Sequence, residues 1–186
     1  MRANELKNRL ECFPIIAAIR DNRWRQALSS PAEILFYLEA NILTVRDRIR
    51  QAHAADKIVF VHLDLAEGIG KDRSGLQYLQ ECGVDGIIST RSTVIRTARE
   101  LGFMTVQRIF ALDSQGMGTV QDMLHAANPH FMEIMPGVIP KIVKRFSDGA
   151  VPVIAGGLIE TKAEVTAALR SGATAISTGC PELWEL

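Results

Sequence analysis

The stretch GVDGIIST, residues 83–90, and the stretch GATAISTG, residues 172–179, carry the same pattern of a short apolar strand with a polar end. The strand at 86–88 is apolar on both faces, as is the run IIAAI at 15–19. Strands of this kind are typical of parallel sheets whose outer face is covered by helices. The two stretches therefore indicate an α/β fold in which similar strands occupy the fourth and the eighth position, as in a duplicated half-barrel.

Strands and helices are expected to alternate along the whole chain. Strands are predicted at residues 14–19, 34–39, 57–64, 86–90, 104–110, 131–135, 151–155 and 174–178, and helices between them at 44–55, 93–101, 115–127, 139–146 and 161–171. Eight βα units at a spacing of roughly 23 residues favour a closed barrel over an open sheet. Since such barrels usually have about 250 residues, we expect a small single-domain TIM-like (β/α)8 barrel over residues 1–186, with short loops and one helix reduced to a turn.

The composition points to one soluble domain. The 186 residues are 47% hydrophobic and 23% charged, with 21 basic and 21 acidic side chains. Cys12, Cys82 and Cys180 are scattered and form no C-x-x-C pair, so we expect reduced thiols. The apolar run at 13–19 is too short to cross a membrane, which favours a cytoplasmic protein without a membrane partner. The charge balance lacks the basic excess of a dedicated nucleic-acid binder, so any RNA contact must use a local patch.

The carboxyl ends of the strands are where a barrel of this kind binds its ligand. Alternation along a strand predicts that His62 and Asp64 point inward with Phe60, and that Glu133 points inward with Phe131. The same reasoning places Glu39 inside with Tyr37 and leaves open whether Gln107 or Arg108 faces inward. The candidate residues for binding a polyol or a charged group are Arg20, Glu39, His62, Asp64, Arg91, Arg108 and Glu133.

Carboxylates buried inside a barrel need partners, because an unpaired buried charge is costly. Glu39, Asp64 and Glu133 should therefore contact arginines or ligand hydroxyls. The alternative is that these groups form an ion-pair layer that only plugs the mouth of the barrel. For His62 alone, a hydrogen-bonded core histidine is as plausible as a ligand contact.

The sixth, seventh and eighth strands end in glycine-containing segments rather than in charged side chains. Glycine lets the main chain approach an anion, and barrels commonly hold phosphate after strands seven and eight. A simple turn is the alternative for each glycine pair. The candidate phosphate-binding residues are Gly137, Gly156, Gly157, Ser177, Thr178 and Gly179. Together with the polar rim they imply a small, phosphorylated and polyhydroxylated ligand.

A complete catalytic set is missing from the strand ends. A Schiff-base enzyme needs a lysine inside the barrel, but Lys57 opens its strand at the amino end. His62 and Asp64 have metal-ligand spacing, but no second half of a metal site accompanies them. We therefore predict no catalytic residue, no metal site and no cofactor. A barrel enzyme acting on a glycerol phosphate or sugar phosphate, as an isomerase, epimerase or synthase, remains the alternative.

Five segments in order, and the closing residues 182–184, resemble one known family. They are VHLDLAEGI at 61–69, IISTRS at 87–92, QRIFALDS at 107–114, EIMPGVIP at 133–140 and AGGLI at 155–159. They resemble the glycerol uptake operon antiterminators. The resemblance implies a bacterial regulator with glycerol 3-phosphate as effector, which acts on the leader of glycerol-operon messenger RNA and prevents early termination of transcription. The stretch TGCP at 178–181 departs from the family pattern, so Cys180 is not counted as a contact.

The RNA-binding surface implied by the resemblance would have to come from small basic groups on predicted helices. The candidates are Arg46 and Arg50, then Arg96 and Arg99, and finally Lys141, Lys144 and Arg145. The three residues of the last group share one helix face. The alternative for each group is the solvated side of an outer helix, because RNA binding normally needs a larger basic footprint. A ligand-gated homo-oligomer could join small patches into one surface.

Overall fold

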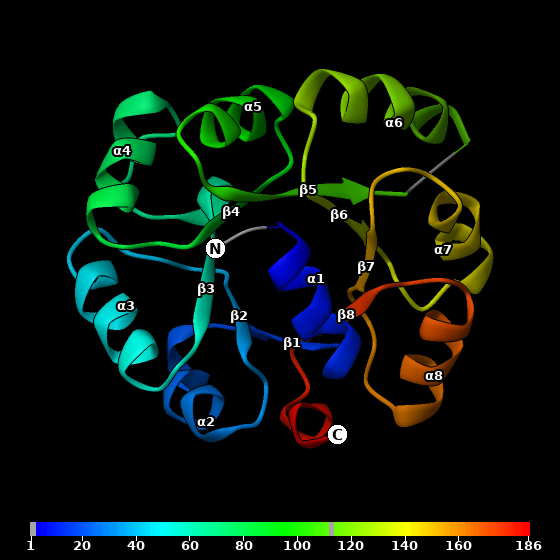
Figure 1. The fold of residues 1–186 in the computed structure, drawn as a ribbon, viewed down its shortest axis with the longest axis horizontal. Helices are drawn as coiled ribbons and strands as arrows, with labels where there is room; N and C mark the ends of the chain where they lie inside the picture. Colours follow the sequence, from blue (N-terminus) through cyan, green and yellow to red (C-terminus); the bar gives the residue numbers. More distant parts are fainter. Residues whose placement is uncertain (1–2, 112–113) are drawn as a thin grey trace.

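Eight parallel strands close into a barrel in the computed structural model, which describes residues 3–111 and 114–186 (Figure 1). Each strand pairs with the next along the chain, and the last pairs with the first. The strands are β1 (Ile15–Ile19), β2 (Ile34–Tyr37), β3 (Ile58–His62), β4 (Gly86–Ser89), β5 (Met104–Phe110), β6 (Phe131–Met135), β7 (Val153–Gly156) and β8 (Ala175–Thr178). The predicted TIM-like (β/α)8 barrel is confirmed.

The helices form a ring around the barrel, apart from the first (Figure 1). They are α1 (Ala3–Cys12), α2 (Trp24–Ser29), α3 (Val45–Ala54), α4 (Arg73–Glu81), α5 (Ser92–Glu100), α6 (Ser114–Ala127), α7 (Pro140–Ser147) and α8 (Lys162–Arg170). Short 3-10 helices lie at η1 (Asp21–Arg23), η2 (Leu63–Leu65) and η3 (Pro181–Glu185). After β8 the outer helix is reduced to η3, as the short chain required. No helix in the described ranges is long and apolar enough to span a membrane.

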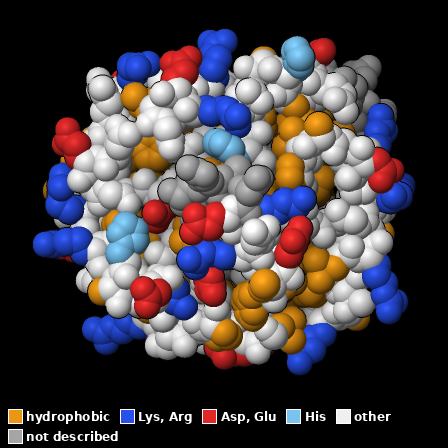
Figure 2. Space-filling view, in the orientation of Figure 1, with side chains coloured by type: hydrophobic (Ala, Val, Ile, Leu, Met, Phe, Trp, Pro, Cys, Tyr) orange, Lys and Arg blue, Asp and Glu red, His pale blue; other side chains and the backbone are white. Residues whose placement is uncertain are grey.

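Helix α1, which the sequence patterns did not predict, closes the amino end of the barrel. Leu6 and Leu10 are four residues apart and fully buried, and they belong to the interior cluster with Ile34 and Ile58. Four-residue spacing puts both leucines on one face of the helix. The opposite face is charged, and Figure 2 shows acidic and basic side chains around this end of the molecule. The leucine face of α1 therefore covers the amino end of the barrel.

Strand β2 is shorter than predicted, and the side chain of Tyr37 points to the other face of the sheet. It ends at Tyr37, so Glu39 lies beyond the ladder and strand alternation does not apply to it. The ring of Tyr37 packs against Trp24 on α2 with 5.0 Å between ring centroids, and its hydroxyl donates to Asp21 at 2.8 Å. Phe36 takes the inward position instead, against Phe60. The prediction that Tyr37 faces the interior is wrong, because Trp24 and Asp21 hold its ring and hydroxyl outside.

The outer helices begin at residues whose side chains satisfy free backbone N–H groups. Thr161 starts α8 with a capping box, in which its hydroxyl accepts from the Glu164 amide at 3.3 Å and Glu164 accepts from the Thr161 amide at 2.9 Å. Asp72 starts α4 by accepting from the Gly75 amide at 2.9 Å. Each of these helices follows the carboxyl end of a strand, so the caps fix where the loops around the barrel mouth end.

The closure of the amino end by α1 can be tested by truncating one leucine. Leu10→Ala is expected to lower the free energy of unfolding by about 2–5 kcal/mol, because it removes buried side-chain volume that the barrel interior cannot refill. Chemical denaturation measures this difference. Lys7→Ala on the exposed face of α1 is the control, with an expected change within about 0.5 kcal/mol. Equal effects of both substitutions would contradict the closing role of the leucine face.

Candidate functional site

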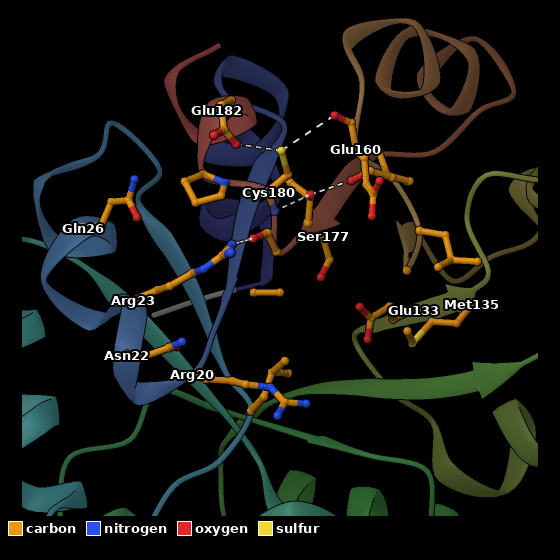
Figure 3. A pocket seen from close by; sticks show the side chains of 18 of the residues that line it. Arg20, Asn22, Arg23, Gln26, Glu133, Met135, Glu160, Ser177, Cys180 and Glu182 are labelled. Carbon is orange, nitrogen blue, oxygen red and sulfur yellow. Dashed lines mark hydrogen bonds between the residues drawn. The ribbon is translucent and has the colours of Figure 1, made fainter.

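A cavity of about 1010 Å³ opens at the carboxyl ends of β1, β6, β7 and β8 (Figure 3). Seven of the candidate residues from the sequence line it: Arg20, Arg108, Glu133, Gly157, Ser177, Thr178 and Gly179. They come from five different strands or strand ends. Because these segments are far apart in the sequence, closure of the barrel is what assembles this site.

The inner wall of the cavity is a buried ion pair. Arg108 Nε donates to Glu133 Oε2 at 2.6 Å, and the two side chains are 8% and 1% exposed. The residues are direct partners in the register between β5 and β6. Inward placement of Glu133 is therefore observed, and Arg108 rather than Gln107 faces the cavity. The Gln107 amide instead donates to the Thr90 carbonyl at 2.8 Å.

Two candidate phosphate residues serve the packing of this wall. Gly156 lies so close to the Glu133 carboxylate that a Cβ there would collide with Oε1. The Gly137 amide donates to the Gly156 carbonyl at 2.6 Å, and a Cβ at Gly137 would come within 2.7 Å of the Gly156 nitrogen. Neither glycine lines the cavity. The missing side chain of Gly156 makes room for Glu133, and that of Gly137 lets the chain after β6 lie against the backbone at the end of β7.

The loops after β7 and β8 are tied together at the side of the cavity. Gly157 and Leu158 have φ values of +78° and +60°, so the chain turns sharply as it leaves β7. The Thr178 hydroxyl donates to the Ile159 carbonyl at 2.7 Å and accepts from the Cys180 amide at 3.0 Å. Thr178 thus fixes both loops with its own side chain. The neighbouring Ser177 lines the cavity.

Asp64 and Arg91 form a second polar group that lies outside the cavity lining. The Asp64 carboxylate accepts from the Thr90 amide at 2.7 Å, from the Ser89 hydroxyl at 2.8 Å and from Arg91 at 3.1 Å. Burial opposes ionisation of this carboxyl, but the hydrogen bonds outweigh it and lower the pKa of Asp64 below its ordinary 3.8. The carboxylate is therefore saturated by its own chain.

His62 points into the barrel interior, as predicted, and is neutral there. It is 4% exposed, and burial together with the positive charge of Arg108 lowers its pKa to about 4. Asp64 lies 3.8 Å away, which is beyond hydrogen-bonding distance. Within the described part of the chain neither ring nitrogen has a partner. His62 does not line the cavity, so its contact with a ligand stays a prediction.

Arg20 and Glu39 pair at the outer rim, with 2.7 Å between Nη1 and Oε1. Arg20 lines the cavity, whereas Glu39 does not. Glu39 therefore serves as the counter-charge of Arg20.

The sequence patterns missed several residues that follow β1, β7 and β8. Arg23, at the end of η1, donates to the Gly179 carbonyl across the cavity mouth (Figure 3). Cys180 does line the cavity, although it was not counted as a contact, and its thiol donates to Glu182 at 3.0 Å. The missed residues include Asn22, Arg23, Gln26, Leu158, Glu160, Cys180 and Glu182. The only sequence signal that could have identified them is their position within a few residues of a strand end.

The three basic groups considered for RNA lie on separate helices, at different sides of the barrel (Figure 1). On α3, Arg50 pairs with Asp47, and Arg46 donates to the Glu81 carbonyl. On α5, Arg96 is exposed and Arg99 is half-buried. On α7, Lys141, Lys144 and Arg145 are exposed, and Lys144 pairs with Asp148 at 2.9 Å. The structure does not join these groups into one patch.

The polar groups of the cavity include several that bind ligands through hydrogen bonds and charge. Guanidinium donors, a carboxylate oxygen and a serine hydroxyl face the same space, and such groups recognise hydroxyls and anions. In the described ranges no lysine lines the cavity, and no cluster of three histidine, cysteine or carboxylate side chains has the geometry of a metal site. The arrangement suits a small polar ligand.

Comparisons with known proteins identify one family. Residues 15–184 match the family model described as glycerol-3-phosphate responsive antiterminator. The chain is 33% identical over 176 residues to the uncharacterized protein YgcP of Escherichia coli (strain K12), covering 93% of this chain and 92% of that protein. A solved structure of the glycerol uptake operon antiterminator regulatory protein from Listeria monocytogenes is similar with 32% identity and a TM-score of 0.88, over 93% of this chain and 95% of that one.

Two further structural similarities differ in what they show. A glycerol uptake operon antiterminator-related protein from Thermotoga maritima has 29% identity and a TM-score of 0.83, over 92% of this chain and 98% of that one. A putative deoxyribose-phosphate aldolase from Coccidioides immitis has a TM-score of 0.71 but only 13% identity, over 93% of this chain and 85% of that one. The second likeness shows the barrel fold alone.

The saturated carboxylate of Asp64 generates a prediction for stability. Asp64→Asn is expected to lower the free energy of unfolding at pH 7 by about 1.5–3 kcal/mol, because it removes charge-assisted hydrogen bonds. The folded-state pKa lies below the ordinary 3.8, so the stabilisation is complete above the unfolded pKa and is lost as the pH falls through the folded pKa. Denaturation at several pH values should show the difference between wild type and variant shrinking below about pH 4.

Asp148→Asn is the control for this measurement, since its pairing with Lys144 is exposed and should contribute less than about 1 kcal/mol. A difference between wild type and Asp64→Asn that persists unchanged at low pH would contradict the assigned role of the ionised carboxylate.

Proposed function

Because the chain belongs to the glycerol-3-phosphate responsive antiterminator family, we propose that it binds glycerol 3-phosphate in the cavity at the carboxyl ends of its strands. In response to this effector it binds the leader of glycerol-operon messenger RNA and prevents early termination of transcription. The observation that carries the proposal is the buried Arg108–Glu133 pair in the wall of a polar cavity, in a chain that matches this family over residues 15–184.

The Arg108–Glu133 pair suits the hydroxyl end of the effector. A hydroxyl both donates and accepts, and this pair presents guanidinium donors beside a carboxylate oxygen. Glu133 Oε2 is engaged by Arg108, whereas Oε1 lies against Gly156. Oε1 thus remains to accept from a ligand hydroxyl. The rest of the predicted polyol set, His62, Asp64, Arg91 and Glu39, then supports this wall from behind or from the rim.

The phosphate end of the effector suits the opposite side of the cavity, where the backbone of the β7 and β8 ends is accessible. Gly157, Ser177 and Gly179 all line that side. Main-chain groups at these two strand ends are common phosphate ligands in barrels of this fold. Gly156 takes part indirectly, because its missing side chain leaves room for Glu133, and Gly137 does so by packing against the end of β7.

The function proposed is regulatory rather than catalytic. The family is one of antiterminators, and the aldolase-like structures share only the fold with this chain. Within the described residues the cavity lacks the lysine that Schiff-base chemistry needs. For the alternative, an enzyme acting on a glycerol or sugar phosphate, the Glu133 carboxylate would be a general base within the cavity.

For RNA binding, helix α7 has the most available charge. In the part of the chain that the structure describes, Lys141 and Arg145 have no carboxylate partner, whereas Arg50 on α3 is paired. Spacing of three and four residues puts Lys141, Lys144 and Arg145 on one exposed face. We assign α7 the leading part in phosphate contact with RNA, with α3 and α5 as the alternatives.

Effector binding is tested by calorimetric titration with glycerol 3-phosphate, with glycerol and inorganic phosphate as comparison ligands. Saturable binding of the phosphate ester is expected, with far weaker binding of either fragment. Glu133→Gln should weaken the affinity by roughly 10- to 100-fold, because a charged hydrogen bond contributes about 1.5–3 kcal/mol. Glu81→Gln, on the exposed side of α4, is the matched control and should bind like wild type. Unchanged affinity of a folded Glu133→Gln protein would refute this residue as a contact.

RNA binding is tested by mobility-shift titration of the leader transcript at several salt concentrations, with and without glycerol 3-phosphate. The double variant K141Q/R145Q should bind more weakly and show a shallower salt dependence, because each lost phosphate contact reduces the slope by about 0.7 for single strands. The double variant R46Q/R50Q removes the same charge from α3 and should change binding little. A larger loss from the α3 variant would move the RNA-binding surface away from α7.

A further inference from the structure

Three arginines line the cavity, and they differ in what neutralises them. Arg20 is paired with Glu39 at 2.7 Å, and Arg108 is paired with Glu133 at 2.6 Å. Arg23 has no carboxylate within 4.0 Å among the residues that the structure describes. Its charge is therefore the least compensated of the three.

Arg23 contacts the end of β8 through a hydrogen bond that leaves most of its donors free. Its Nη1 donates to the Gly179 carbonyl, so the guanidinium lies across the cavity mouth from η1 to β8 (Figure 3). A guanidinium has five N–H donors, and one carbonyl uses one of them. A neutral carbonyl is also a weaker partner than an ionised oxygen. The remaining donors of Arg23 are thus suited to an anion placed beside Gly179.

Ser177 contributes a polar side chain to the cavity at the same end of β8. Its side chain is on a residue only 3% exposed, and it lines the cavity. The neighbouring Thr178 hydroxyl is engaged by two backbone groups, the Ile159 carbonyl and the Cys180 amide. A serine hydroxyl that faces a cavity can donate to, or accept from, a ligand placed there.

Glu182, one of the carboxylates that line this side of the cavity, already has a partner. Glu182 accepts a hydrogen bond from the Cys180 thiol at 3.0 Å. The positive charge of Arg23 reaches Glu182 and contributes to lowering its pKa, behind the contribution of that hydrogen bond. The two charges attract each other without forming an ion pair. Arg23 is consequently preoriented at the cavity mouth but not neutralised.

We propose that Arg23 and Ser177 form the anion subsite of the cavity and hold the phosphate of the effector, with the hydroxyl end directed to Arg108 and Glu133. This inference rests on the proposed function, because it assigns the orientation of the same effector. Arg23 then determines the preference for a phosphate ester over an unphosphorylated polyol. It also explains why a residue outside the strands lies beside the β8 end.

The subsite is tested by calorimetric titration of three phosphate ligands: glycerol 3-phosphate, 2-hydroxyethyl phosphate and inorganic phosphate. Arg23→Gln is expected to weaken the affinity for both esters by the same factor, roughly 10- to 100-fold, so that their ratio stays constant. Arg23→Lys should restore part of the affinity, since it keeps the charge but loses the forked geometry. Glu133→Gln should instead change the ratio between the two esters, because it acts on the hydroxyl end.

Arg25→Gln is the matched control, because Arg25 is exposed on the same segment and does not line the cavity. It should bind all three ligands like wild type. Thermal unfolding of each variant shows that the fold is intact.

The outcomes distinguish failure of the proposed subsite from failure of the proposed effector. Wild-type affinity for glycerol 3-phosphate in a folded Arg23→Gln protein would overturn the subsite and leave the proposed effector standing. A wild-type protein that binds another phosphate ligand, but not glycerol 3-phosphate, and loses that binding in Arg23→Gln would overturn the effector and support the subsite. A wild-type protein that binds none of the three ligands would overturn both.

Discussion

The buried Arg108–Glu133 pair is the constraint on which the carboxyl half of the barrel depends. Below it the interior is apolar, from the leucines of α1 up to the β5 and β7 side chains. A buried ion pair often stabilises a fold less than apolar residues of equal volume would, yet loss of one partner is strongly destabilising. Gly156 has to stay small so that Glu133 fits in place. The placement of these groups is therefore better accounted for by ligand recognition than by stability.

The two sides of the barrel mouth differ in how far the protein itself satisfies their polar groups. Around Asp64, the Ser89 and Thr90 hydroxyls and the Arg91 guanidinium already occupy the carboxylate oxygens. Above β6, β7 and β8 the strand ends leave a cavity whose polar groups are only partly satisfied. An ion-pair layer that merely plugged the mouth would be satisfied on both sides. The asymmetry accounts for the separation of the predicted site residues into a saturated group and a cavity-lining group.

The sequence predicted the eight strands and the inward direction of Glu133 because both depend on local alternation of apolar and polar residues. Alternation failed at Tyr37, where a partner on another element, Trp24, decides the direction of the ring. Helix α1 was missed because two leucines in a polar segment carry little periodic signal. Arg23 could not be found from any motif, since its place in the cavity depends on how η1 meets the end of β8. Contacts between distant segments are what the sequence patterns could not supply.

Charge alone cannot carry the signal from effector to RNA in the proposed function. A bound phosphate ester adds a charge of about −1.5 to −2 near neutral pH, and this sign opposes RNA binding. Charges on the outer helices that lie more than about 8–10 Å away are largely screened at physiological ionic strength. An effector that favours RNA binding must therefore bind one conformation or assembly state more tightly than another. In the proposed function the loops after β1, β7 and β8 are the elements that the effector contacts, and Arg23 and Thr178 connect them beside the cavity.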